Sequence, residues 1–223
     1  MQSEIRLPPR SLRSLPPKGA SVPSQRPGGT EVGTTLLPIA RAAIAQALGR
    51  DLVAPEHASW LQEPGACFVT LTQGGQLRGC IGSLQARRSI RDDVRANAVA
   101  AALRDPRFAP LRLAELEQTQ IAVSVLSPMR AMRFDSEADA LAQLTPGVDG
   151  LVLEFGAHRS TFLPQVWEQL PTVDSFMTEL KRKAGLAADF WAAGIRLQRY
   201  TVAKWEESPD DARHAATQQE TRP

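Results

Sequence analysis

Apolar residues recur every three or four positions in the segment that follows Thr34 and Thr35. They are Leu36, Leu37, Ala40, Ala43, Ile44, Ala47 and Leu48. This spacing places them on one face of an amphipathic helix, which the threonines can cap and Gly49 can end. The pattern therefore predicts a helix over residues 36–48, with Pro38 in its first turn, where a missing N–H costs little.

Two runs rich in β-forming residues follow, ACFVTLTQ and QLRGCIGSL, and two glycines separate them. This arrangement predicts a β-hairpin with a two-residue turn, in which Val69 faces Cys80 and Leu71 faces Arg78. Because side chains alternate along a strand, Arg78 and Cys80 are then expected on the same face as Cys67. Apolar residues occur on both faces, which predicts a hairpin covered on both sides.

The rest of the chain mixes helix and strand patterns. A capping box at Ser89 predicts a helix that stops before Pro106, and a second hairpin is expected around residues 156–158. Alternation over residues 195–205 predicts a last strand. Because strands and helices do not alternate strictly, the pattern favours an α+β fold with a largely antiparallel sheet flanked by helices.

Composition narrows the setting of the protein. The 223 residues include two cysteines and carry a formal net charge of +2, which is too small to imply a polyanionic partner. Two cysteines give no disulfide framework, as fits a reducing compartment. No apolar run approaches the roughly 18 residues that span a bilayer, and the N-terminus lacks the apolar core of a secretory signal. We therefore expect a cytoplasmic protein without a membrane partner.

The two ends of the chain differ in composition from its middle. The first is rich in proline and arginine, and the last is polar, with glutamine and threonine. We expect a disordered N-terminal arm over residues 1–33, a folded domain over residues 34–207, and a disordered tail over residues 208–223.

Several short motifs occur in a fixed order along the folded region. They are FVTL, LRGCIG (77–82), DPRF (105–108), SVLSP (124–128), DG (149–150), LPQV (163–166) and KAGL (183–186). With them the chain resembles the AmmeMemoRadiSam system protein A family, whose AMMECR domain has LRGCIG as its hallmark. The resemblance implies one domain of two unequal, interleaved subdomains with a cleft between them. It also implies that the protein functions together with a Memo-like protein and a radical S-adenosylmethionine enzyme. It does not identify any residue as catalytic.

The LRGCIG segment holds the sharpest candidate for chemistry. A guanidinium at Arg78 would favour the thiolate of Cys80, giving a nucleophile, a redox thiol or a soft metal ligand. Gly79 and Gly82 lack a Cβ, so a ligand can approach the strand, and Ile81 lies between them. The structural alternative is a buried, inert Cys80, an Arg78 paired with a carboxylate, and glycines that admit a packed helix.

Two further motifs supply weaker candidates for the same cleft. Arg107 can reach a ligand carboxylate or phosphate, whereas a turn network between Asp105 and Arg107 is the structural alternative. Gln165 can hydrogen-bond a substrate or satisfy the backbone at the end of a strand.

Other kinds of site are disfavoured. Cysteine–histidine catalysis needs an oriented histidine, and none of the three histidines belongs to a matched motif. The two cysteines lack the spacing of a structural zinc site. The basic runs over residues 88–95 and 181–183 are better explained as solvated helix faces than as a nucleic-acid surface.

Our first hypothesis is a small-molecule-binding or accessory component that acts with the Memo-like protein and the radical enzyme. Residues 77–82 would floor its cleft, with Arg78 binding an anionic group and Cys80 contributing a thiol contact. The alternatives are an enzyme that uses Cys80 as a nucleophile or redox thiol, and a protein- or nucleic-acid-interaction module. The sequence identifies neither the small molecule nor a cofactor.

Overall fold

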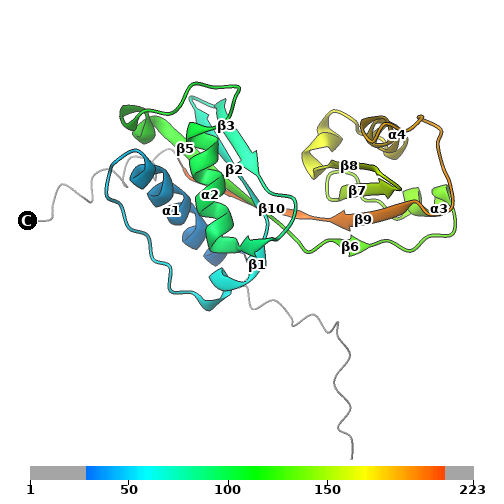
Figure 1. The fold of residues 1–223 in the computed structure, drawn as a ribbon, viewed down its shortest axis with the longest axis horizontal. Coiled ribbons are helices and arrows are strands. Elements are labelled where there is room, and N and C mark those ends of the chain that lie inside the picture. The colour runs from blue at the N-terminus through cyan, green and yellow to red at the C-terminus, as the bar shows by residue number, and fades with distance from the viewer. Residues whose placement is uncertain (1–28, 209–223) are drawn as a thin grey trace, which may run out of the picture.

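The computed structural model describes residues 29–208, which form two lobes that lie side by side (Figure 1). Each lobe contains a four-stranded antiparallel sheet with helices beside it. This arrangement confirms the predicted α+β class. Of the segments expected to be disordered, residues 1–28 and 209–223 lie outside the described residues.

The first lobe holds the N-terminal elements and the last strand. Its elements, with η for 3-10 helices, are α1 (Thr30–Ala47), η1 (Ser59–Gln62), β1 (Pro64–Gly65), β2 (Cys67–Gln73), β3 (Gln76–Gly82), β4 (Arg88–Ser89), α2 (Ile90–Leu103), η2 (Leu113–Gln118), β5 (Thr119–Leu126) and β10 (Val202–Glu206). The sheet runs in the order β10-β5-β2-β3. β3 is therefore an edge strand. Both α1 and α2 cover the same face of this sheet (Figure 1), so the other face of β3 has no helix packed on it.

The second lobe is inserted in sequence between β5 and β10. Its elements are β6 (Arg130–Ala131), α3 (Glu137–Ala142), β7 (Gly150–Phe155), β8 (His158–Phe162), η3 (Pro164–Glu168), α4 (Val173–Lys183) and β9 (Arg196–Tyr200). The sheet runs in the order β6-β9-β7-β8, and β7 and β8 form the predicted second hairpin. Because the chain leaves the first lobe and later returns to it, the lobes are interleaved.

The single strand predicted over residues 195–205 is instead two strands in different sheets. β9 belongs to the second lobe and β10 to the first, with Thr201 between them. Ser127 fixes this crossing, because its N–H donates to the Thr201 carbonyl and its hydroxyl accepts from the Thr201 N–H, both at 2.9 Å. Alternation continues through the crossing, so the pattern alone hid the break.

The first helix begins at Thr30, earlier than the predicted start at residue 36 and inside the segment expected to be a disordered arm. Val32 is 5% exposed and packs in the core of the first lobe, which accounts for the longer helix. Pro38 therefore lies inside the helix and not in its first turn. Because Pro38 has no N–H, the carbonyl of Thr34 lacks its usual hydrogen bond within the helix, and Thr34 is exposed to solvent.

The first hairpin forms, but its register differs from the prediction. Thr70 pairs with Cys80 and Leu71 with Gly79, because a β-bulge between Leu71 and Thr72 leaves Arg78 as an extra residue. A shift of one residue moves side chains to the opposite face. Cys80 therefore lies on the helix-free face with Thr70, and the expectation that it shares a face with Cys67 was wrong. The hairpin is also not covered by helices on both sides.

Three groups of buried side chains hold the two lobes. The largest lies between α1, α2 and the first sheet, and a second lies between α4 and the second sheet. A small third group, formed by Ala66, Leu126, Val152 and Tyr200, joins the lobes. Phe68 packs against this third group from the helix-free face of β2. The junction between the lobes is thus apolar but small.

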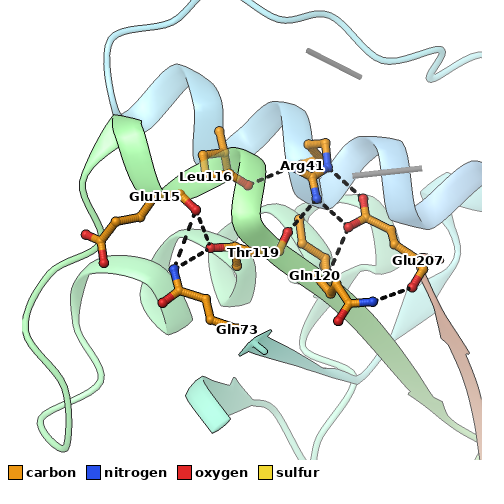
Figure 2. A network of polar contacts seen from close by, with 8 residues as sticks. Arg41, Gln73, Glu115, Leu116, Thr119, Gln120 and Glu207 are labelled. Carbon is orange, nitrogen blue, oxygen red and sulfur yellow. Dashed lines mark hydrogen bonds and ion pairs between the residues drawn. The ribbon is translucent and has the colours of Figure 1, made fainter. Parts of the chain in front are cut away.

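A buried ion pair ties the end of the chain to the first helix. Arg41 and Glu207 have side chains that are each 6% exposed, and the Arg41 Nε donates to Glu207 Oε1 at 2.7 Å. Figure 2 shows that Arg41 also donates to the carbonyls of Leu116 in η2, at 3.2 Å, and of Thr119 at the start of β5, at 2.8 Å. The Glu207 carboxylate in turn accepts from the N–H of Ile121 at 2.9 Å. The network joins α1, β5 and the residue after β10.

Candidate functional site

The LRGCIG and DPRF motifs meet at the backbone of Cys80. The Cys80 N–H donates to Asp105 Oδ2 at 2.8 Å, and a terminal nitrogen of Arg107 donates to the Cys80 carbonyl at 3.3 Å. On an edge strand every second residue turns its backbone polar groups away from the sheet. The aspartate and the arginine therefore act as a partner for β3 where a further strand would otherwise pair.

Asp105 and Arg107 also hold each other. The Asp105 side chain is 2% exposed, and it accepts from Arg107 through the backbone N–H at 3.1 Å, Nε at 3.0 Å and a terminal nitrogen at 2.7 Å. The hydrogen bond from the Arg107 side chain, helped by the N–H groups of Cys80 and Arg107, holds the pKa of Asp105 well below its usual range. The same pair raises the pKa of Arg107, with a smaller contribution from Cys80. The turn network proposed for this motif is therefore present.

The two cysteines lie in contrasting environments. Cys67 is 0% exposed, and burial together with the charge of Asp93 raises the pKa of its thiol far above the usual range. Cys80 is half-buried, and its Sγ accepts a hydrogen bond from the Thr70 hydroxyl at 3.3 Å. Only Cys80 therefore presents a partly accessible thiol on the helix-free face.

The glycines and Ile81 on the same strand have packing roles. A Cβ on Gly79 would lie 2.2 Å from the carbonyl oxygen of Ala101, so α2 occupies the space beside this residue. A Cβ on Gly82 would lie 2.2 Å from the ring of Phe68. Ile81 packs against the core of the first lobe. At Gly79 the missing side chain thus admits a helix, as the structural alternative supposed, and leaves no room there for a ligand.

Arg78 lies at the bulge and pairs with an acidic residue of η2. One terminal nitrogen lies 3.6 Å from Glu115 Oε1, and the side chain of Arg78 is 14% exposed. Its other terminal nitrogen is buried without a hydrogen-bond partner among residues 29–208. A buried donor without a hydrogen-bond partner is costly, so this nitrogen is an unusual feature of the bulge.

Gln165 and His158 lie away from this cluster of contacts. Gln165 is exposed in η3 of the second lobe, where the neighbouring Trp167 is buried and donates to the Asp149 carbonyl at 2.7 Å. His158 Nδ1 lies 2.8 Å from the Ala184 carbonyl at the end of α4, and His214 lies outside the described residues. The structure brings Cys80, Asp105 and Arg107 together, and Gln165 belongs to the other lobe.

The basic runs of the sequence are largely paired. Arg91 lies 3.0 Å from Asp92, and Arg95 lies 2.8 Å from Glu56. Lys181 is 2% exposed and bonds to Glu137 and to the Ala188 carbonyl, so it is no part of a solvated run. These pairings favour structural roles on α2 and α4.

A polar network around Asp93 was missed in the sequence. Asp93 is 1% exposed, and its carboxylate accepts from the Cys67 N–H at 2.8 Å and from the Ser83 hydroxyl at 2.9 Å. The Asn97 amide and the Arg88 Nε complete the set, at 3.0 and 2.8 Å. The sequence signal was an acidic residue in the first turn of a capped helix, a position where the helix dipole alone favours a carboxylate.

The fold and these contacts define a class of protein. It is an α+β protein of two interleaved lobes, in which an edge strand with a half-buried cysteine is held by an aspartate–arginine pair. No helix among the described residues is long and apolar enough to cross a membrane.

The chain belongs to the AMMECR1 family, whose model matches residues 37–205. Protein MJ0810 of Methanocaldococcus jannaschii is 33% identical over 186 residues, which cover 79% of this chain and 90% of that protein. A protein of Methanothermobacter thermautotrophicus is 34% identical over 190 residues, covering 81% and 97%. The crystal structure of the uncharacterized protein PH0010 from Pyrococcus horikoshii matches with a TM-score of 0.68 and 31% identity over 80% of this chain and 92% of that chain. These matches bear out the AMMECR domain that the motifs indicated.

Proposed function

We propose that the protein is a small-molecule-binding or accessory component that acts with a Memo-like protein and a radical S-adenosylmethionine enzyme. In this proposal β3, with residues 77–82, forms the floor of its binding site, and the helix-free face of the sheet is the working surface. The two partner proteins come from the resemblance to the AmmeMemoRadiSam system protein A family, and the proposed binding site rests on the chemistry of this strand.

The observation that carries the proposal is the clamp on Cys80. Asp105 and Arg107 bind the N–H and the carbonyl of this residue at the outer edge of the sheet, while the residue stays half-buried on the helix-free face. Holding one backbone position so firmly orients the side chain that it bears. Arg78, with its unpartnered buried nitrogen, adds a cationic donor two residues away in sequence. A thiol on a fixed backbone, with a cationic side chain at the bulge of the same strand, supports a role in contact with a ligand or partner.

Chemical labelling of Cys80 tests the accessory role. The full-length protein is treated with iodoacetamide, alone and with each purified partner protein from the same genome, and the labelling of Cys80 is followed by mass spectrometry. With a partner at about ten times its Kd, only about a tenth of the protein is unbound, so labelling slows about tenfold. An Arg78→Ala variant is expected to lose this protection, whereas Arg112→Ala, an 83% exposed control, keeps it.

Two results would count against the proposal. Unchanged labelling with both partners, together with separate elution on size-exclusion chromatography, would remove the accessory role. Loss of a measured turnover on Cys80→Ser, in a protein that stays folded, would favour instead the enzyme that uses Cys80 as its nucleophile.

A further inference from the structure

A cavity of about 530 Å³ lies between the two lobes, beside the loop that joins β3 to β4. Its polar lining comes from both lobes: Ser83, Gln85, Arg87, Arg88 and Asp93 from the first, and Arg159 of β8 from the second. None of these residues belongs to β3 or to the DPRF motif. The function proposed above therefore makes no use of them, and either proposal can fail without the other.

The only carboxylate among the described lining residues is already saturated. Asp93 accepts hydrogen bonds from the Cys67 N–H, the Ser83 hydroxyl, the Arg88 Nε and the Asn97 amide, at 2.8 to 3.0 Å. A carboxylate offers about four lone-pair sites, so Asp93 has none left for a ligand. Its effect on the cavity is to hold the Arg88 side chain and the Ser83 hydroxyl in place.

The three arginines of the cavity retain donors that residues 29–208 do not use. Arg88 is 43% exposed and engages only its Nε, with Asp93. Arg87 bonds to the neutral side chain of Gln85, through Nε at 2.9 Å and a terminal nitrogen at 2.7 Å, and has no carboxylate partner among the described residues. Arg159 is 39% exposed and engages its Nε with Glu154 at 2.9 Å. Each guanidinium thus keeps at least one terminal nitrogen for a further acceptor.

We propose that this cavity binds a small molecule that carries a phosphate group, with Arg87, Arg88 and Arg159 as its ligands. The planar fork of a guanidinium matches the oxygens of a phosphate, and oriented arginines lose less entropy on binding. Three guanidinium groups favour a dianion over a single carboxylate. The cavity volume falls in the range of about 300–1,000 Å³ that is usual for small-molecule sites.

A nucleic-acid backbone is the less suitable occupant. Surfaces that bind single strands combine a basic groove with aromatic side chains on which bases stack. Here three basic side chains line one open pocket, and none of its described lining residues is aromatic. Because Arg159 and Arg88 come from different lobes, a bound phosphate would also bridge the lobes across their small apolar junction.

Isothermal titration of the full-length protein with pyrophosphate at low ionic strength tests this site, with citrate as the carboxylate probe. The double variant Arg87→Gln with Arg159→Gln removes two of the three guanidiniums but leaves Arg88, whose bond to Asp93 supports the fold. We expect this variant to lose about tenfold to a hundredfold in pyrophosphate affinity. Arg182→Gln, a 58% exposed arginine on α4 of the second lobe, is the matched control and should bind as the wild type does.

The outcomes separate the proposal from its rivals. Weaker binding of citrate than of pyrophosphate, with the loss confined to the double variant, supports a phosphate site. An equal loss in Arg182→Gln, or no heat with pyrophosphate at about 1 mM, overturns the proposal. Tighter binding of a single-stranded oligonucleotide than of pyrophosphate would overturn it too, since an extended polyanion surface would then explain the arginines. Labelling of Cys80 is expected to be the same in wild type and double variant.

Discussion

The backbone N–H of Cys80 donates a hydrogen bond of 2.8 Å to the carboxylate of Asp105. This contact joins a strand motif to a turn motif that lies 25 residues further along the chain. Because β3 is an edge strand, its outward N–H would otherwise face water or the strand of another molecule. The DPRF turn therefore closes the edge of the sheet at the half-buried Cys80.

Replacing Asp105 by asparagine is expected to weaken the fold. Asparagine keeps the shape of the side chain but removes the charge that pairs with Arg107 and one of the acceptor oxygens. The midpoint of thermal unfolding should fall, measured by circular dichroism at neutral pH. Asp189→Asn, at an exposed position, is the control and should change stability by no more than about 0.5 kcal/mol. Equal midpoints for both variants would mean that the clamp does not stabilise β3.

The low pKa of Asp105 predicts how this contribution varies with pH. Its pKa in the folded state is depressed below the unfolded value of about 3.9, so the folded state holds the proton less tightly. The stabilisation is therefore present above about pH 4 and is lost as the pH falls through the folded pKa. The difference in unfolding free energy between wild type and Asp105→Asn should be constant from pH 5 to 8 and should shrink below about pH 4. A difference that grows on acidification would contradict this assignment.

The sequence predicted the hairpin but not its register. The two glycines at the turn and the β-rich runs were sufficient signals for two paired strands. A bulge depends on how Arg78 and its neighbours pack against the rest of the fold, and no local sequence pattern predicted it. That single extra residue reverses the faces of Cys80 and Gly79. The candidate site was therefore found by motif, while its geometry required the structure.

The two cysteines should differ in reactivity. In the folded protein Cys80 should react with iodoacetamide, because it is half-buried on the helix-free face. Cys67 is fully buried and its thiol pKa is raised, so it should react only when the structure opens. We expect a rate ratio of at least about a hundredfold at pH 8, measured by mass spectrometry, and its loss in denaturant. Comparable rates in the native state would show that β2 and α2 separate readily.

Gly79 provides a test of the helix-packing role of the LRGCIG motif. A methyl group at this position would lie 2.2 Å from the backbone oxygen of Ala101, and backbone moves less easily than a side chain. Gly79→Ala should lower the free energy of unfolding by about 1–3 kcal/mol, measured with urea. Leu77→Ala, on the same strand and 44% exposed, should have a smaller effect. If Gly79→Ala is neutral, the motif's glycine serves something other than close packing of α2.

The interleaving of the lobes could not be read from local patterns either. Alternation runs on through Thr201, where the chain passes from one sheet to the other. Local propensity describes whether a residue is extended, and it carries no information on which strand it will pair with. The same limit hid the pairing of Arg41 with Glu207, which lie 166 residues apart in the chain. The family motifs supplied what the periodicity lacked, namely two interleaved subdomains.

That buried pair makes the last described strand a stabilising element. Glu207 accepts from Arg41 and from the Ile121 N–H, and each side chain of the pair is 6% exposed. Breaking a buried pair by removing one charge typically costs about 3–5 kcal/mol, because the other charge stays buried without compensation. Glu207→Gln should therefore lower the free energy of unfolding by about this amount in urea.

Replacing both residues, as Arg41→Met with Glu207→Leu, should cost less than the sum of the single changes. The exposed pair of Lys204 and Glu206 is the matched control, and Glu206→Gln should cost no more than about 1 kcal/mol. If Glu207→Gln and Glu206→Gln have equal effects, the tie between α1 and the end of β10 does not hold the lobe together.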